Sequence, residues 1–176
     1  MTGDTDFAGD EAIVYYEDAL DEVVKRAPEA LRTMHINRGN RTIPAQYLGR
    51  LDFYMFQPGH NYEGQPEAWR LPQDFIANYP KKPMVNSEPC YEQMGASRNV
   101  YWRFTAQDCR ASVWSSILAG ASAGVTYGAH GVWNWQTSRS QGSVLGEGFD
   151  MPSAGKSACS LRVCGTLARS SMCLPA

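Results

Sequence analysis

Strand-like and helix-like segments alternate along the chain, and this alternation limits the possible folds more than any other feature. Strand-like runs cover residues 31–39, 51–61, 83–88 and 124–135, and helix-forming runs cover residues 11–27, 73–79 and 105–119. Such an order and spacing are typical of parallel strands that are joined by crossover helices. We therefore expect an α/β fold that is built around a parallel sheet.

Two of the helices have clear local signals. The first has one apolar face, which is formed by Ile13, Tyr16, Leu20, Val23 and Ala27 at spacings of three and four. Asp10 is placed to cap its start. Thr105 and Asp108 have the spacing of a capping box at the start of the last helix. The residues of that helix expected to face inward are Val113, Trp114, Ile117 and Leu118.

Composition excludes several classes of protein. The chain has 176 residues and a net charge of -2, which suits one globular domain without a broad basic surface for nucleic acid. No apolar run reaches the length of about 18 residues that a membrane span needs. The five cysteines include no CxxC pair, which favours a reducing compartment, and we expect the cytoplasm. Any signal peptide would have to lie in a preceding segment.

Polar residues gather where the expected strands end. In parallel α/β sheets, side chains at the carboxyl ends of the strands usually form the functional site. The polar and aromatic residues at these positions are His35, Asn37, Gln57, His60, Asn61, Asn86, Glu88, Tyr127, His130, Trp133 and Trp135. The sequence therefore predicts one site at this edge of the sheet.

Glu88 is the strongest single candidate for a catalytic group. Pro89 restricts the backbone of Glu88 to extended angles, which aims its side chain reproducibly. The alternative is a glutamate that forms an ion pair or caps a loop. Hydrolysis of a glycosidic bond needs a second carboxyl group. Asp4, Asp6, Asp10 and Asp52 are the candidates for this second group.

Position in the chain distinguishes three of these aspartates. Asp52 lies at a strand start and Asp10 at a helix start, whereas Asp4 in GDTDF would follow a preceding strand. The alternative for Asp4 is a disordered terminus.

Other chemistries are less well supported. The three histidines have no HxH or HExxH spacing, so hydrogen bonding to substrate or core is favoured over a metal site. Cys90 could act as a thiol nucleophile with His60 as its base, but no basic neighbour is evident that would lower the pKa of the thiol. Trp133 could stack on a sugar ring or fill the barrel wall. No phosphate-binding glycine loop is present.

Four segments together resemble the apiosidase-like catalytic domain family, which consists of (β/α)8-barrel glycoside hydrolases. They are GDTDF, LDFYMFQPGHN, KPMVNSEPCYEQMG and AGVTYGAHGVWNW, and the resemblance covers about residues 2–152. It implies that Asp4 is the general acid/base and Glu88 the nucleophile of a retaining reaction on a carbohydrate, without a metal or organic cofactor. The residues expected to bind the sugar are His35, Gln57, His60, Asn86, Tyr91, Tyr127, His130 and Trp133.

The chain departs from the family pattern in two ways. It starts at what would be the end of the fourth strand, so we expect the C-terminal half of a (β/α)8 TIM barrel over residues 1–153. Such a half barrel exposes sheet edges and is expected to fold poorly alone or to dimerise. Residues 154–176 do not match the family and are expected to be an atypical tail. A non-catalytic carbohydrate-binding or interaction protein is the alternative function.

Overall fold

A parallel sheet lies at the centre of the part of the chain that the structure, a computed structural model, describes: residues 4–7, 9–96 and 102–130. Its strands are β1 (Tyr54–Phe56), β2 (Met84–Asn86) and β3 (Gly124–Val125), in this order across the sheet. The ends of the three strands are in register, because Phe56 pairs with Asn86 and Asn86 pairs with Val125. The mixed α/β class and the parallel pairing predicted from the sequence are thus confirmed.

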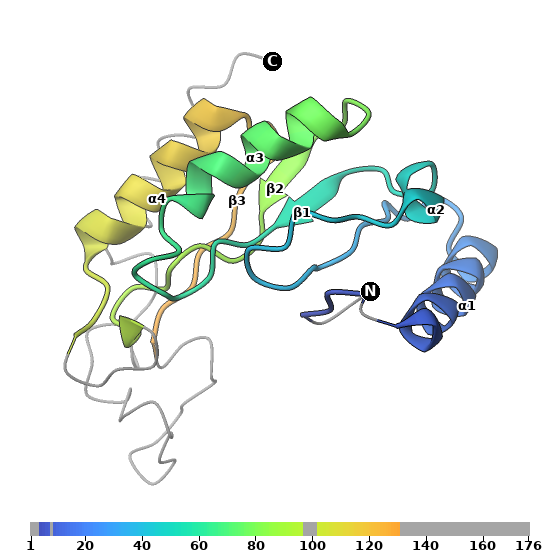
Figure 1. The fold of residues 1–176 in the computed structure, drawn as a ribbon, viewed down its shortest axis with the longest axis horizontal. Coiled ribbons are helices and arrows are strands. Elements are labelled where there is room, and N and C mark those ends of the chain that lie inside the picture. The colour runs from blue at the N-terminus through green and yellow to red at the C-terminus, as the bar shows by residue number, and fades with distance from the viewer. Residues whose placement is uncertain (1–3, 8, 97–101, 131–176) are drawn as a thin grey trace, which may run out of the picture.

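Four helices accompany these strands in the described residues. They are α1 (Asp10–Arg26), α2 (Ala45–Leu48), α3 (Glu67–Asn78) and α4 (Ala106–Ala119). Helices α3 and α4 pack against each other along the sheet, whereas α1 lies at the opposite end of the molecule (Figure 1). None of the described helices is long and apolar enough to cross a membrane.

Helices α1 and α4 form where the sequence predicts them, but two details of the prediction were wrong: the N-cap of α1 and the inward face of α4. Gly9, not Asp10, is the N-cap of α1, and no side chain caps this helix. The capping box of Thr105 and Asp108 in α4 is confirmed. Its inward face holds Val113 as expected, but Trp114 and Leu118 are exposed, and small residues are buried in their place: Cys109, Ser112 and Ser116. The small Ser116 side chain on this face is within hydrogen-bond distance of Asn86 of β2.

The strand predictions located the sheet but overestimated its extent. The runs at 51–61 and 83–88 contain β1 and β2, and the run at 124–135 contains β3, although residues 131–135 lie outside the described part. The run at 31–39 forms no strand, because Ile36 makes only an isolated parallel bridge to Thr5. Helix α3 starts at Glu67 rather than near residue 73, since it accommodates Pro72 in its interior. The four residues of α2 are too few to show a period.

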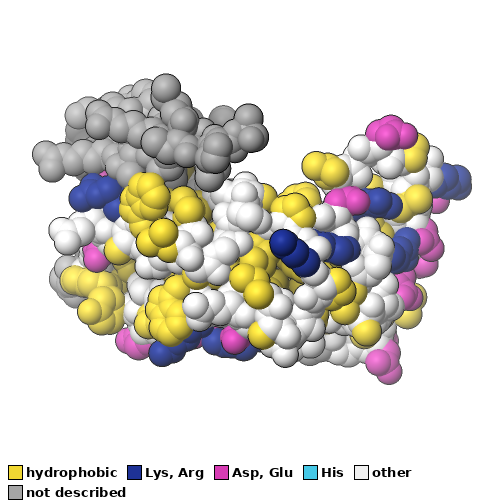
Figure 2. Space-filling model, turned by 90° about the horizontal axis from the view of Figure 1, so that it is seen from above, with side chains coloured by type: hydrophobic (Ala, Val, Ile, Leu, Met, Phe, Trp, Pro, Cys, Tyr) yellow, Lys and Arg dark blue, Asp and Glu magenta, His cyan; other side chains and the backbone are white. Residues whose placement is uncertain are grey.

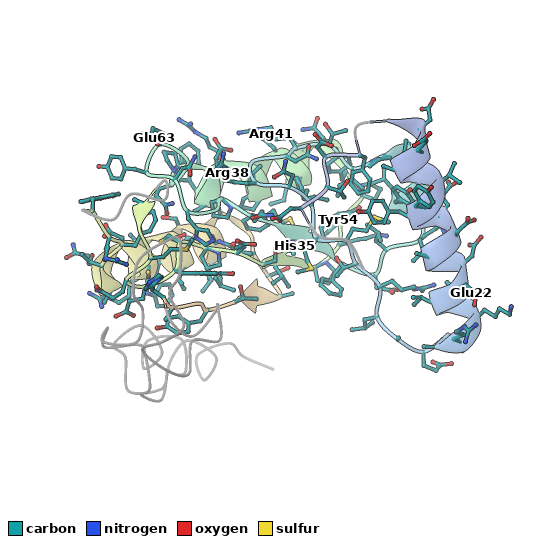
Figure 3. All side chains as sticks on the ribbon, turned by 90° about the horizontal axis from the view of Figure 1, so that it is seen from below. Glu22, His35, Arg38, Arg41, Tyr54 and Glu63 are labelled. Atoms are coloured by element: carbon teal, nitrogen blue, oxygen red, sulfur yellow. The ribbon has the colours of Figure 1, made fainter. Side chains whose placement is uncertain are left out.

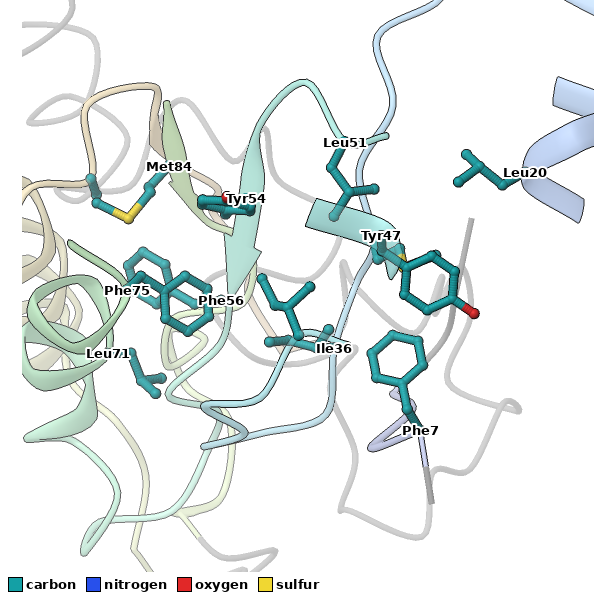
Figure 4. Packing of buried hydrophobic residues seen from close by; sticks show 13 residues of the cluster. Phe7, Leu20, Ile36, Tyr47, Leu51, Tyr54, Phe56, Leu71, Phe75 and Met84 are labelled. Carbon is teal, nitrogen blue, oxygen red and sulfur yellow. The ribbon is translucent and has the colours of Figure 1, made fainter. Parts of the chain in front are cut away.

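One apolar core extends from α1 to α3 and fixes the sheet beneath the strand ends. Phe7, Leu20 and Tyr47 occupy its α1 side, and Phe56 and Phe75 occupy its α3 side (Figure 4). These aromatic side chains pack edge to face or tilted against their neighbours, the geometry that aromatic pairs prefer. The backbone around the carboxyl ends of β1 and β2 is therefore held by a dense core.

Candidate active site

Glu88 is held at the carboxyl end of β2 by a buried polar chain. Asn86, the last residue of β2, accepts a hydrogen bond through Oδ1 from the Glu88 backbone N–H at 3.2 Å. The Asn86 Nδ2 donates to Ser116 Oγ of α4 at 2.8 Å, and Asn86 is fully buried. The Gly59 N–H donates to the Glu88 carbonyl at 3.1 Å, which ties the loop after β1 to the loop after β2. The backbone of Glu88 is thus fixed from two sides.

The Glu88 carboxylate lies between two imidazoles. His60 Nε2 is 2.7 Å from Glu88 Oε1, and His35 Nε2 is 3.3 Å from Glu88 Oε2. The side chain of Glu88 is only 20% exposed. Burial alone would raise the pKa of Glu88, but the hydrogen bonds from His35 and His60 outweigh it and lower the pKa to about 2. Glu88 is therefore ionised at all ordinary pH values.

Asp4 faces Glu88 across the site. Gln57 Nε2 donates to Asp4 Oδ1 at 2.6 Å and also to the Ile36 carbonyl at 2.7 Å. His35 Nδ1 lies 3.4 Å from the same Asp4 oxygen, so one imidazole contacts both carboxylates. Asp4 Oδ and Glu88 Oε oxygens lie within 4.8 Å of each other. His35 is central in the molecule, between α1 at one end and α4 at the other (Figure 3).

Both carboxylates line one cavity of about 590 Å³. Tyr91 forms part of its wall, with its ring centroid 4.2 Å from that of His60. The Tyr91 ring lies directly against Gly128, where a Cβ atom would come within 2.3 Å of it. Burial and the negative charges of Glu88 and Asp4 raise the pKa of Tyr91 to about 12, so its hydroxyl keeps its proton. The cavity thus offers carboxylates and hydrogen-bond donors together, which suits a ligand rich in hydroxyl groups.

Asp4, His35 and Glu88 also carry atoms of the kinds that ligate metal ions. Among the described residues, Asp4, His35 and Glu88 bring one possible ligand atom each to within 4.8 Å of the others. Both ring nitrogens of His35 already face carboxylate oxygens, at 3.4 and 3.3 Å. His35 therefore links the two carboxylates, with a hydrogen bond to Glu88 and a charge interaction with Asp4.

Seven of the residues predicted from the sequence line the cavity, His35 contacts both of its carboxylates, and Tyr127 and His130 do not line it. Asp4, Gln57, His60, Glu88 and Tyr91 line the cavity, as do Asn37 and Asn61. Asn86 supports Glu88 from below the site. The Tyr127 hydroxyl donates to Glu92 Oε2 at 3.3 Å, and burial raises the pKa of Glu92. His130 is fully buried, and its backbone N–H donates to the Glu92 carbonyl at 2.8 Å.

The prediction for Trp133 falls outside the described residues. Arg38 and Met94 also line the cavity and were not predicted. Arg38 directly follows Asn37, so its position at the end of an expected strand was the available signal. Met94 and Ser116 gave no signal, because only the packing of distant segments brings them to the site.

Two alternative assignments lose support from the geometry. Cys90 is buried, and its Sγ lies 3.8 Å from the buried Cys109 Sγ, outside the cavity lining. Asp52 forms an ion pair with Arg32 at 2.9 Å at the amino end of β1. Neither group is placed to act on a ligand that is held between Asp4 and Glu88.

Two solved structures that are similar to this chain are described as glycoside hydrolases. A glycoside hydrolase family 5 protein from Bacteroides vulgatus ATCC 8482 aligns with a TM-score of 0.63 and 26% identity, over 76% of this chain and 31% of that one. A second structure, described as a glycoside hydrolase, aligns with a TM-score of 0.65 and 24% identity, over 81% and 35%. The chain thus spans about a third of the length of these structures.

The family comparison covers more of the chain. No curated protein matches the sequence. The model of one family, Apiosidase-like, catalytic domain, matches residues 1–158. This match covers most of the chain and includes the GDTDF and NSEP segments that supply Asp4 and Glu88. The chain therefore belongs to the Apiosidase-like catalytic domain family.

Proposed function

We propose that the protein is a retaining glycoside hydrolase in which Glu88 is the nucleophile and Asp4 the general acid/base. The observation that carries this proposal is the approach of the two carboxyl groups, whose oxygens lie within 4.8 Å in one cavity. Retaining enzymes hold their carboxyl groups about 5–5.5 Å apart, whereas inverting enzymes need room for a water molecule between them.

The environments of the two carboxyl groups support different roles. A nucleophile must be ionised, and the pKa of Glu88 is about 2 because His35 and His60 hydrogen-bond to its carboxylate despite its burial. Asp4 is 66% exposed, so it can exchange protons with water. Its backbone has a φ of 49°, a left-handed conformation that aspartate tolerates better than most residues. Gln57 holds it toward Glu88.

In the first step, Asp4 donates its proton to the glycosidic oxygen while a Glu88 oxygen attacks the anomeric carbon. The bond from that carbon to the leaving oxygen breaks, and a glycosyl ester of Glu88 forms. In the second step, the Asp4 carboxylate removes a proton from water, which attacks the same carbon and releases Glu88. The family name suggests apiose or a related sugar as the residue removed.

The strand order supports a (β/α)8 barrel as the complete fold. Strands β1, β2 and β3 are parallel and follow one another across the sheet, and helices α3 and α4 connect them in the chain. Gln57 and Glu88 follow strands β1 and β2, and Asp4 lies next to the bridged residue Thr5, within hydrogen-bond distance of Gln57, so the three lie at one edge, which is where barrel enzymes place their active sites. We propose that the described strands form the C-terminal half of such a barrel.

The assignment is tested by kinetics on a panel of aryl glycosides with the intact protein. Glu88→Gln keeps the size of the side chain but removes the attacking charge, so kcat/KM should fall by at least about 10³-fold. The matched control is Asp18→Asn, which neutralises an exposed carboxylate on α1 and should leave kcat/KM unchanged. Full activity of Glu88→Gln would refute the assignment.

Azide rescue separates the two roles. In Asp4→Ala, azide should restore turnover and give a glycosyl azide of the substrate's own configuration, since Glu88 still forms the ester. In Glu88→Gly, azide should attack directly and give the opposite anomer. Rescue products of the reverse configurations would exchange the two roles.

A non-catalytic carbohydrate-binding function is the second candidate. The high exposure and left-handed backbone of Asp4 favour it, because a general acid is usually held more firmly. Sugar binding without turnover of any aryl glycoside by the intact protein would select this alternative.

A further inference from the structure

A second cavity of about 510 Å³ lies beside the loop after β1, the same loop that supplies His60 to the candidate active site. It is bounded by residues 62–66, by the first turn of α3, and by Phe104 and residues 108–115 of α4. We propose that this cavity binds one neutral sugar residue of a polysaccharide, as a site separate from the Asp4–Glu88 cavity. The choice of a carbohydrate as the ligand class rests on the proposed function. The volume is within the range of about 300–1,000 Å³ that is usual for small-ligand sites.

Two buried oxygen atoms of cavity-lining residues lack hydrogen-bond partners within the described part of the chain. They are Gln65 Oε1 and Ser112 Oγ. The amide nitrogen of Gln65 is fully used, since it donates to the Gly59 and Asn61 carbonyls at 3.1 and 2.8 Å, so its oxygen points away from that loop. Ser112 is only 4% exposed. Buried polar atoms are rarely left without partners, and a change of side-chain rotamer on binding would turn both oxygens toward the hydroxyl groups of a sugar.

Aromatic rings form the rest of the cavity wall. Tyr62 is 61% exposed and Trp69 is 42% exposed, and both line the cavity. The Tyr62 ring makes an edge-to-face contact with Trp102, at a centroid distance of 4.8 Å. Trp102 packs in turn on the buried Phe104. Exposed rings that are fixed in this way are typical of binding surfaces, because they offer apolar faces at a small cost in conformational entropy.

The charge of the wall selects a neutral ligand. Glu63 and Asp108 contribute carboxylates, and no lysine, arginine or histidine is among the described residues that line the cavity. A polymer of uronic acids would be repelled, whereas sugar hydroxyl groups can donate hydrogen bonds to both carboxylates. Figure 2 shows hydrophobic side chains gathered over the α3 and α4 half of the molecule, and charged ones denser toward α1.

One loop connects the two cavities. Gly59, His60 and Asn61 line the Asp4–Glu88 cavity, and Tyr62, Glu63 and Gln65 line the second one. A polysaccharide that is held in the second cavity would therefore be kept close to the candidate active site without occupying it. Binding there should raise the local concentration of substrate chains, with little effect on a small substrate that reaches only the first cavity.

The test is affinity gel electrophoresis of the intact protein in gels that contain xyloglucan, arabinan or galactan as neutral probes, or polygalacturonate as an acidic one. At least one neutral polymer should retard the protein, and polygalacturonate should not. Trp69→Ala and Tyr62→Ala should each raise the apparent dissociation constant for that polymer, measured from the retardation, about tenfold. Trp114→Ala is the matched control, since Trp114 is 41% exposed on α4 and does not line the cavity.

The outcomes separate this proposal from the proposed function. Retardation by none of the neutral polymers, by polygalacturonate alone, or equally in Trp69→Ala, Tyr62→Ala and wild type would overturn the second site, whatever the activity on aryl glycosides. If Trp69→Ala does not fold, the highly exposed Tyr62→Ala decides. Retardation that depends on Trp69 in a protein without aryl-glycoside turnover would support the second site and refute only the hydrolase assignment.

Discussion

The charge of Glu88 and the protonation of His35 depend on each other. The pKa of Glu88 is lowered from 4.5 to about 2, and that of His35 is raised above 6.5 by its hydrogen bond to Glu88, which outweighs burial. Ionised Glu88 therefore stabilises the fold fully above pH 4.5, and this contribution is lost as the pH falls toward 2. Protonated His35 stabilises the fold below pH 6.5, and this contribution is lost as the pH rises through its raised value.

We expect Glu88→Gln to lose the most stability, relative to wild type, between about pH 4.5 and 6.5, where both groups are charged. Urea unfolding of the two proteins across the pH range gives this difference directly. A difference that stays constant from about pH 3 to pH 8 would show that the ion pair contributes nothing to folding.

Gln57 is expected to matter for catalysis although it has no chemical role. Gln57→Glu would replace the donor nitrogen that lies 2.6 Å from Asp4 with a carboxylate oxygen, so Asp4 would be repelled from its position. A displacement of about 1 Å can cost about 10²-fold in rate, and we expect such a loss in kcat/KM. The exposed Gln107→Glu on α4 is the control. Equal kinetics of Gln57→Glu and wild type would show that Asp4 is positioned by other contacts.

Residues with a local signal were predictable, and those positioned by packing were not. Glu88 was found because Pro89 follows it at a strand end, and Asp4 gained support only from the family resemblance. Ser116 supports Asn86 from another helix, so its role depends on a contact between residues 30 positions apart in sequence.

At the scale of elements, the helix that is best encoded locally is α4. Thr105 Oγ1 accepts from the Asp108 N–H, and Asp108 Oδ2 accepts from the Thr105 N–H at 2.8 Å. Thr105→Ala removes one half of this box and should lower the free energy of unfolding by about 1 kcal/mol. Thermal and urea unfolding measure the loss, with the exposed Thr42→Ala as control. A loss no larger than that of the control would mean that α4 is held by packing alone.

One buried hydroxyl, that of Ser116 in α4, accepts a hydrogen bond from the Asn86 amide of β2. Ser116→Ala would leave the amide of the fully buried Asn86 without its acceptor, at a cost of about 1–3 kcal/mol. Because Asn86 also accepts from the Glu88 N–H, the rate should fall as well. The exposed Ser122→Ala should change stability by less than about 0.5 kcal/mol. Unchanged stability in Ser116→Ala would show that Asn86 finds another partner.

Helix boundaries were predicted correctly where the sequence carries a capping signal. The capping box located α4 correctly, whereas the helix that was expected over residues 73–79 begins six residues earlier, at Glu67, with Pro72 in its interior. The run at 31–39 has the composition of a strand but only one bridge, to Thr5, because strand formation requires a neighbouring strand that composition does not reveal.

At the scale of the whole molecule, parallel strands place acidic, amide and imidazole groups at one edge of the sheet, above a continuous aromatic core (Figures 1 and 4). The fold class and the edge that carries the site were predictable, because alternating strand and helix segments imply parallel strands, and the carboxyl ends of parallel strands lie at the same edge of a sheet. The second cavity was not predictable, because it arises where the loop after β1 meets the start of α3 and one face of α4.

The central claim is that Asp4 and Glu88 act as a closely spaced pair. It is tested most directly by proton NMR of the anomer that is formed first when the intact protein cleaves an aryl glycoside, before mutarotation. We predict that the first sugar released has the same anomeric configuration as the substrate, because Glu88 forms an ester that water then displaces. A first product of the opposite configuration would contradict the account.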